Sequence, residues 1–348
     1  MIVNSKREAI AWEVIKTLVK RFKKFPKDSS ENRNAPFHEA FLNAFVDELE
    51  GKVVDIPFLI SISSWLHGLS TTLGQSFFEN VAHVLSDGEK RDFTPDSNML
   101  LQITNLQKST IADIITDLKN RNKQPDLEAE NIILVSASTQ GDVIDANKFS
   151  VDVYIDDDDI TAIELKTVKP NSGEMRGEKQ KILEAKAALF KKYSGKRVSY
   201  YIGFPFDPTS DTPTDSDKAR FMNSIIGGTS YFAPKEVLLA GELWDFLSGD
   251  TNTMKQILEI INTIATPEFM NDYKFLKISK NRKMDQQRYR ILLKKWFLFS
   301  ELFLFDNDKK LKENINTTSD KRQYNQHIFK YDGKYKLERF YKLSRLLQ

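Results

Sequence analysis

The fold of this chain is decided by the stretch Val151-Asp152-Val153-Tyr154-Ile155, an acidic turn from Asp156 to Asp159, and Ile160-Thr161-Ala162-Ile163-Glu164-Leu165-Lys166. The two apolar runs around a turn predict a β-hairpin. On the second strand, the period of two places Glu164 and Lys166 on one face. Eleven residues separate Asp152 from Glu164, so a three-residue loop at 157–159 would place the two carboxylates opposite each other. We therefore expect two carboxylates and one ammonium to converge.

This trio suits the hydrolysis of a phosphodiester. Mg²⁺ prefers oxygen ligands and keeps several waters, so Asp152 and Glu164 are predicted metal ligands. A metal-bound water would be the nucleophile, and Lys166 would orient or deprotonate that water and stabilise the charge of the transition state. The alternative is a solvated edge hairpin with an acidic turn, because Glu-x-Lys in a strand arises often by chance.

The spacing Asp-x11-Glu-x-Lys resembles the active site of the PD-(D/E)XK nuclease superfamily, although Ser150-Val151 precedes the aspartate and the proline of that family is absent. Residues 64–85 resemble the N-terminal region of TdeIII-like type II restriction endonucleases, most clearly at Leu73-Gly74-Gln75-Ser76-Phe77-Phe78-Glu79. The resemblance makes Glu79 a further catalytic residue that reaches the metal from a helix upstream of the hairpin. An ordinary exposed helix acid is the alternative. Further similarity lies at residues 36–39, 166–171 and 239–247.

The resemblance implies an α/β fold with a PD-(D/E)XK restriction-endonuclease-like core, a mixed β-sheet flanked by helices, and helical N- and C-terminal additions. It implies a type II restriction endonuclease that uses Mg²⁺ to cut double-stranded DNA at a short G/C-rich palindrome of the GGNCC kind. Cutting a palindrome implies a homodimer. A cognate DNA methyltransferase would be its genetic partner and not a physical one. The alternatives are a structure-specific repair or recombination nuclease of the same fold and a non-catalytic DNA-binding protein.

Composition predicts a globular protein that fits a reducing cytoplasm, and the resemblance implies that the cytoplasm is that of a bacterium or archaeon. The 348 residues are 40% hydrophobic and include no cysteine, which excludes disulfides and zinc–cysteine sites. The most apolar run, Ile291 to Phe305, is too short and too charged to cross a bilayer. No membrane partner is expected.

Charge is distributed unevenly along the chain. Residues 274–348 hold 20 Lys and Arg against 8 Asp and Glu, a net charge of +12, and residues 1–273 hold 31 against 41, a net charge of −10. Thirteen aromatic residues are interleaved with the basic ones, which favours a folded basic element over a disordered arm. Such a surface would neutralise DNA phosphates. A solvated lysine-rich helical surface or a dimer interface is the alternative.

Arginine and lysine are also the residues that pair with guanine in the major groove. The candidates for DNA contact are Lys169, Arg176, Lys179, Arg220, Arg288, Arg290, Lys294 and Lys295. The sequence does not choose among them.

Three segments are expected: a helical part at 1–125 whose helix contributes to the active site, a catalytic core at 126–270, and a basic, aromatic-rich helical segment at 271–348. Apolar periodicity predicts helices at 6–25, 37–50, 57–68, 74–86, 106–122, 174–193, 242–248, 251–264, 284–304 and 335–346. Runs of β-branched and aromatic residues predict strands at 132–136, 149–155, 160–168, 197–204 and 236–239.

Overall fold

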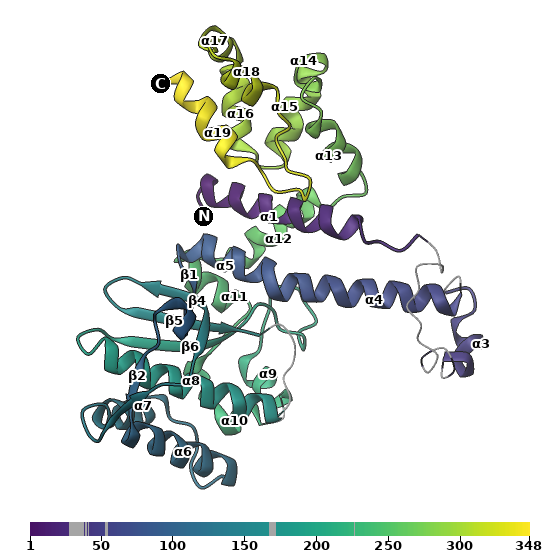
Figure 1. Cartoon of the computed structure of the whole chain (residues 1–348). Coiled ribbons are helices and arrows are strands. Elements are labelled where there is room, and N and C mark those ends of the chain that lie inside the picture. The colour runs from purple at the N-terminus through teal and green to yellow at the C-terminus, as the bar shows by residue number, and fades with distance from the viewer. Residues whose placement is uncertain (28–37, 39, 41, 53–54, 167–171, 226) are drawn as a thin grey trace. The chain divides into compact units, whose positions relative to one another are not determined.

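The computed structural model describes residues 1–27, 38, 40, 42–52, 55–166, 172–225 and 227–348 (Figure 1). The chain divides into two compact units. Residues Met1–Ile2 and Phe78–Gln256 form the first, which we call the sheet unit, and Val3–Phe77 with Ile257–Gln348 form the second, the helical unit. The functional division expected at residues 125 and 270 stays a prediction.

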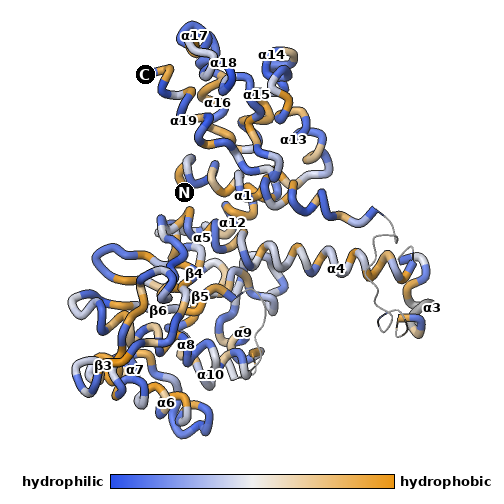
Figure 2. The backbone as a smooth tube through the Cα atoms, viewed as in Figure 1, coloured by the Kyte–Doolittle hydropathy of each residue, from blue (hydrophilic) through white to orange (hydrophobic). Residues whose placement is uncertain are grey.

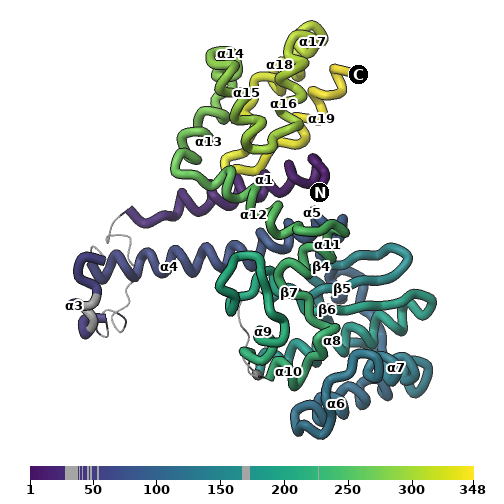
Figure 3. The backbone as a smooth tube through the Cα atoms, turned by 180° about the vertical axis from the view of Figure 1, so that it is seen from behind, coloured from purple at the N-terminus to yellow at the C-terminus, as the bar shows by residue number. Residues whose placement is uncertain are grey.

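A five-stranded mixed sheet forms the centre of the sheet unit, in the order β1-β4-β5-β6-β7 (Figure 3). Its strands are β1 (Glu89–Phe93), β4 (Phe149–Asp156), β5 (Ile160–Leu165), β6 (Val198–Phe204) and β7 (Val237–Leu239). Strands β1, β4 and β5 pair antiparallel, whereas β5, β6 and β7 pair parallel. The two short strands β2 (Gln102–Thr104) and β3 (Val143–Asp145) pair with each other separately. The prediction of a mixed sheet flanked by helices is therefore confirmed.

Helices cover both sides of this sheet. They are α5 (Phe78–Ser86), α6 (Asn105–Asn120), α7 (Leu127–Ala137), α8 (Ser172–Lys192), α9 (Lys218–Ser224), α10 (Gly228–Tyr231), α11 (Gly241–Ser248) and the beginning of α12 (Thr253–Ile264). Helices α5 and α11 lie on one side, and α8 lies on the other with α6 and α7 outside it (Figure 1). Hydrophobic residues run along β4 and β5 between these layers (Figure 2).

The neighbours of Gly203 on β6 show which face of β5 each side chain occupies. A Cβ atom at Gly203 would lie 3.0 Å from both Ile163 and Leu243, so α11 packs closely against the sheet on the face that Ile163 occupies. Ile163 and Leu165 therefore face α11. Because side chains alternate along a strand, Glu164 faces α8.

The predicted strand at 132–136 is wrong, because these residues belong to helix α7. Asp126 caps the helix by accepting hydrogen bonds from the backbone N–H groups of residues 128 and 129. Leu134 is fully buried, whereas Ile132 is 70% exposed. Burial at helical spacing and the aspartate cap outweigh the β-branched composition of the run.

The described part of the helical unit contains α1 (Asn4–Phe22), α3 (Val46–Leu49), α4 (Ile56–Thr72), a π-helical turn (Leu73–Phe77), the remainder of α12, α13 (Phe269–Lys277), α14 (Asn281–Met284), α15 (Gln286–Lys295), α16 (Phe299–Asp306), α17 (Asp308–Glu313), α18 (Thr318–Asn325) and α19 (Leu337–Ser344). The predicted single helix at 284–304 is wrong. Phe297 has a φ of +57°, which separates α15 from α16. Next to it, Trp296 is fully buried and stacks on Phe269 at 5.2 Å between ring centroids.

Most other predicted elements are confirmed within about two to four residues at their ends, the usual uncertainty of element boundaries. The predicted helix at 37–50 lies partly outside the described residues, as do the last residues of the predicted strand at 160–168. Where the chain is described, it contains no helix with the length and apolarity needed to cross a membrane.

Candidate active site

The site begins with the register of the β4–β5 hairpin. Val153 pairs with Ile163, Asp156 pairs with Ile160, and the residues between Asp156 and Ile160 form the three-residue connection that the sequence predicts. Asp152 and Glu164 are the residues that follow the Val153–Ile163 pair on the two strands. An Asp152 Oδ2 atom accepts a hydrogen bond from the backbone N–H of Leu165 at 2.9 Å, which fixes the carboxylate beside the second strand.

Glu164 and Lys166 lie on the face of the sheet that α8 covers. Glu164 is 4% exposed, and its Oε1 accepts a hydrogen bond from Lys166 Nζ at 3.1 Å. Two residues of α8 complete this group. Lys181 Nζ donates to Glu164 Oε2 at 2.7 Å, and Lys166 Nζ lies 2.8 Å from Glu178 Oε1. The result is a row of ion-paired side chains with alternating charges, in the order Glu178, Lys166, Glu164 and Lys181.

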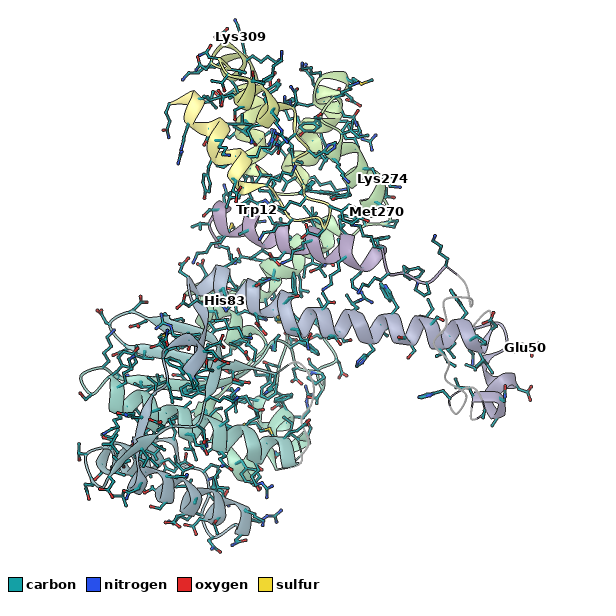
Figure 4. All side chains as sticks on the ribbon, in the orientation of Figure 1. Trp12, Glu50, His83, Met270, Lys274 and Lys309 are labelled. Atoms are coloured by element: carbon teal, nitrogen blue, oxygen red, sulfur yellow. The ribbon has the colours of Figure 1, made fainter. Side chains whose placement is uncertain are left out.

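Helix α5 and strand β1 extend the site on the side of Asp152. Lys90 Nζ lies 3.3 Å from Glu79 Oε2 and 3.6 Å from Asp152 Oδ1, so it bridges the two carboxylates. His83 lies one turn after Glu79 on α5 (Figure 4). Its Nε2 atom is 2.6 Å from the backbone carbonyl oxygen of Asp152 and forms a hydrogen bond with it. Lys90 and His83 therefore connect helix α5 to Asp152, and the predicted catalytic role of Glu79 stays a prediction.

The electrostatics of the site favour charged lysines. Burial by itself would lower the pKa of Lys166, but the carboxylates of Glu164 and Glu178 outweigh burial and raise the pKa above its usual value. The pKa of Lys90 is raised in the same way, because Glu79 and Asp152 outweigh its partial burial. Both lysines are therefore ammonium groups at neutral pH.

Tyr200 on β6 lies at the bottom of the site. Its side chain is 1% exposed, and its hydroxyl group has no hydrogen-bond partner among the described residues. Burial raises its pKa well above the usual value, and the charges of Glu164, Asp152 and Glu178 raise it further. The phenol is thus a neutral donor within electrostatic reach of three carboxylates.

Carboxylate oxygens are the ligands that a hard divalent cation prefers, and the residues of this site fit such an ion. The described residues contain no preformed group of three or more acidic or histidine side chains that could hold a metal. The carboxylates are instead paired with lysines, and the Lys90 ammonium is the cation between Glu79 and Asp152. Because the Lys90 side chain is 47% exposed, it can leave that place without opening the core.

Sequence reasoning missed four contributors to the site: His83, Lys90, Glu178 and Lys181. Strand β1 reads Glu-Lys-Arg-Asp-Phe and lacks the apolar alternation that would mark it as a strand. The sequence spacing of Glu178 and Lys181 could have indicated their contribution. They stand three residues apart in the helix that follows Glu164-x-Lys166, a spacing that puts both on one helix face.

The DNA-contact candidates of the sheet unit differ in their exposure and in their contacts. Lys169 lies outside the described residues, and Arg176 is exposed on α8. Arg220 is exposed and donates to Thr209 Oγ1 at 3.3 Å. The expected role of Lys179 is corrected, because its side chain is 0% exposed and is paired with Glu236 at 2.8 Å, so no phosphate can reach it.

The remaining candidates lie on α15 in the helical unit, and all of them are exposed. Arg288 pairs with Asp272 at 3.0 Å, and Arg290 pairs with Asp306. Lys294 and Lys295 end the helix. The site residues and the basic helix α15 therefore belong to different compact units.

Comparison with known proteins identifies the class of the chain. Residues 3–265 match the family model of the HinfI type II restriction endonucleases. The type II restriction enzyme MjaII of Methanocaldococcus jannaschii is 41% identical over 361 aligned positions, which cover 97% of this chain and 96% of the relative. This confirms the predicted type II restriction endonuclease class, although the matching family is HinfI and not the TdeIII-like family. The substrate of this class is double-stranded DNA, and the chain belongs to the HinfI family of type II restriction endonucleases.

Proposed function

We propose that this restriction endonuclease cuts DNA at a PD-(D/E)XK-type reaction centre that holds Mg²⁺. The observation that supports the proposal is the hairpin register, in which Val153 pairs with Ile163, so that Asp152 and Glu164 are the next residues along the two strands. Asp152, Glu164 and Glu79 would be the metal ligands. Lys166 follows Glu164 on the same face and would be the cationic helper.

Each residue of the centre has a distinct task in this mechanism. When bound, the metal ion would stabilise charge on the scissile phosphate and lower the pKa of a water. Lys166 carries an ammonium at neutral pH, so it stabilises negative charge on the phosphate oxygens as the charge develops. The N–H of Leu165 and the ring of His83 hold the side chain and the backbone of Asp152 in place, which limits reorganisation during the reaction.

We infer that the enzyme acts in the cytoplasm as a C₂ homodimer on a short G/C-rich palindrome, with a DNA methyltransferase as genetic partner. Two-fold symmetry would match a palindrome by giving each strand one reaction centre. Exposed arginines such as Arg176 and Arg220 are eligible to pair with guanine O6 and N7.

Incubation of the purified protein with unmethylated plasmid DNA tests the proposed function. With Mg²⁺ we expect discrete fragments, and sequencing of their ends gives the recognition site. Without a divalent cation the plasmid should stay intact. Cleavage only at branched DNA, or cleavage that needs no divalent cation, would overturn the proposal.

The basic helix α15 would supply affinity without sequence preference. Replacing both Lys294 and Lys295 with alanine should weaken the binding of specific and random duplexes alike. The salt dependence should flatten by about 0.9 log units for each lost phosphate contact. Sedimentation is the check on the alternative, because a variant that becomes monomeric would place these lysines at a dimer interface.

A further inference from the structure

Helix α8 extends the reaction centre beyond the four predicted catalytic residues. Glu178 and Lys181 stand one turn apart on α8, and each pairs with one end of the Glu164-x-Lys166 motif. The distance from Glu178 Oε1 to Lys166 Nζ is 2.8 Å, shorter than the 3.1 Å from Glu164 Oε1 to the same ammonium. Glu178 is therefore the nearer partner of the catalytic lysine.

Glu178 differs from the buried glutamates that hold the fold together. In Glu236, Oε1 and Oε2 lie 2.8 Å and 2.9 Å from Lys179 Nζ, so both oxygens are bound. In Glu301, the guanidinium of Arg339 binds both oxygens at 2.6 Å and 3.3 Å. The Oε2 atom of Glu178 is buried yet has no hydrogen-bond partner among the described residues. An unsatisfied buried oxygen costs stability, so its presence at this place calls for a functional reason.

The proposed metal site provides that reason. Glu164 Oε1 binds Lys166 and Glu164 Oε2 binds Lys181, so both of its oxygens are engaged before any metal arrives. If Glu164 held a metal ion, its negative charge would be shared with that ion, and its attraction for Lys166 would be weaker. A lysine side chain loses rotamer entropy when it is fixed, so Lys166 needs another anchor to stay in the centre. Glu178 is in contact with it already.

We propose that Glu178 is a positioning residue of the cleavage reaction, which holds the Lys166 ammonium in the reaction centre while Glu164 serves the metal. Its Oε1 atom is the anchor, because it lies 2.8 Å from Lys166 Nζ and holds the ammonium beside Glu164. The proposal rests on the proposed function, because it assigns to Glu178 a task that exists only if Lys166 acts on the phosphate.

The test compares Glu178→Gln with Glu184→Gln, a matched control on the same helix. Glu184 accepts hydrogen bonds from Asn147 at 2.8 Å and from Gln180 at 2.9 Å and contacts no residue of the centre. Loss of a positioning partner costs about 10- to 100-fold in activity, so Glu178→Gln should lower kcat by this factor. Its KM, its DNA affinity with Ca²⁺ in place of Mg²⁺, and its thermal midpoint should stay unchanged. Glu184→Gln should match wild type in all four measurements.

The conservative variant Glu178→Asp separates positioning from structure. It keeps the charge and should recover part of the kcat lost in Glu178→Gln, and it decides the question if Glu178→Gln does not fold. A purely structural role would instead lower the thermal midpoint and the DNA affinity together with kcat, in Glu178→Gln and Glu178→Asp alike.

Two variants of the motif keep the two proposals distinguishable. If Glu164→Ala and Lys166→Ala are inactive while Glu178→Gln cleaves at the wild-type rate, the role of Glu178 is refuted and the proposed function stands. If Glu164→Ala and Lys166→Ala themselves cleave normally, the proposed function fails first, and the role of Glu178 fails with it.

Discussion

Helix α8 contributes to two clusters of two lysines and two glutamates that differ in burial. The closed cluster consists of Lys179, Lys186, Glu130 and Glu236, and each of these residues is at most 6% exposed. The open cluster consists of Glu164, Lys166, Glu178 and Lys181, whose lysine side chains are 27% and 34% exposed. Glu178 and Lys179 are neighbours in sequence and point into different clusters.

The difference shows that burial, and not residue type, determines whether an ion pair only stabilises the fold or can also exchange partners. In the closed cluster, Lys179 Nζ lies 2.6 Å from Glu130 and 2.8 Å from Glu236, and all three side chains are buried. Removing one partner there leaves a buried charge. In the open cluster the lysines can move toward solvent or substrate, so the carboxylates are able to change partners. The first arrangement fixes α7 and α8 to the 3-10 turn Pro234–Glu236 that precedes β7, whereas the second leaves its lysines able to change partners.

The largest effect is expected in the open cluster. Glu164→Ala should lower kcat by about three orders of magnitude or more, because it removes a predicted metal ligand and several kcal/mol of transition-state stabilisation. DNA affinity measured with Ca²⁺ and the thermal midpoint should change little. A kcat within about tenfold of wild type would refute the assignment of Glu164.

The closed cluster should show the opposite pattern. Lys179→Met leaves the carboxylates of Glu130 and Glu236 buried without their partner, so it should lower the free energy of unfolding by about 3–5 kcal/mol. The kcat of the remaining folded protein should be unchanged. Chemical denaturation measures the loss, and Lys192→Met at the exposed end of the same helix is the control. Equal stability of the two variants would contradict the distinction between the clusters.

Lys186 gives the closed cluster a pH dependence. Burial lowers its pKa to about 8, against the attraction of Glu236 and Glu130. Below pH 8 the folded state must carry this buried charge, so stability is reduced there and recovers as the pH rises toward the unfolded pKa. Lys186→Met should therefore stabilise the protein at neutral pH, by on the order of 3 kcal/mol. Thermal unfolding from pH 6 to pH 10 should show that this gain in stability becomes smaller above pH 8. A gain that stays constant would show that the buried charge of Lys186 is not its cause.

The smallest effect concerns Glu79, at the border of the open cluster. Glu79→Gln should raise the Mg²⁺ concentration needed for half-maximal cleavage by about 10- to 100-fold, as expected for a weakened ligand or ligand partner. An ordinary surface glutamate would change only stability, by about 0.5 kcal/mol. A metal titration that superimposes on wild type would remove Glu79 from the site.

The sequence predicted the hairpin well because two independent constraints agree there. Alternation fixes the faces of β5, and the length of the connection fixes the register, so Asp152 and Glu164 could be paired without a structure. Helix α7 could not be predicted in this way, because its run of Ile, Leu and Val suits both a strand and a helix. Whether the run forms a helix or a strand depends on the Asp126 cap and on the burial of Leu134.

The roles of individual lysines could not be predicted from the sequence, for a related reason. Lys179 and Lys181 stand in the same helix with similar neighbours, yet Lys179 is fully buried and Lys181 pairs with Glu164 while its side chain is 34% exposed. Only the partners that approach from α7 and from β5 separate them. Lys90 was missed because β1 is too charged to be recognised as a strand.

The lysines around the carboxylates also bear on how the protein matures. Lys90, Lys166 and Lys181 already compensate most of the negative charge of Asp152, Glu164, Glu79 and Glu178. The chain can therefore reach its folded state as an apoprotein, unlike small metal domains that unfold when a chelator removes the ion. A chelator would stop cleavage by such a nuclease without unfolding the protein. A cell could accumulate the protein fully folded, and a laboratory could store it harmlessly beside DNA, until a divalent ion is supplied.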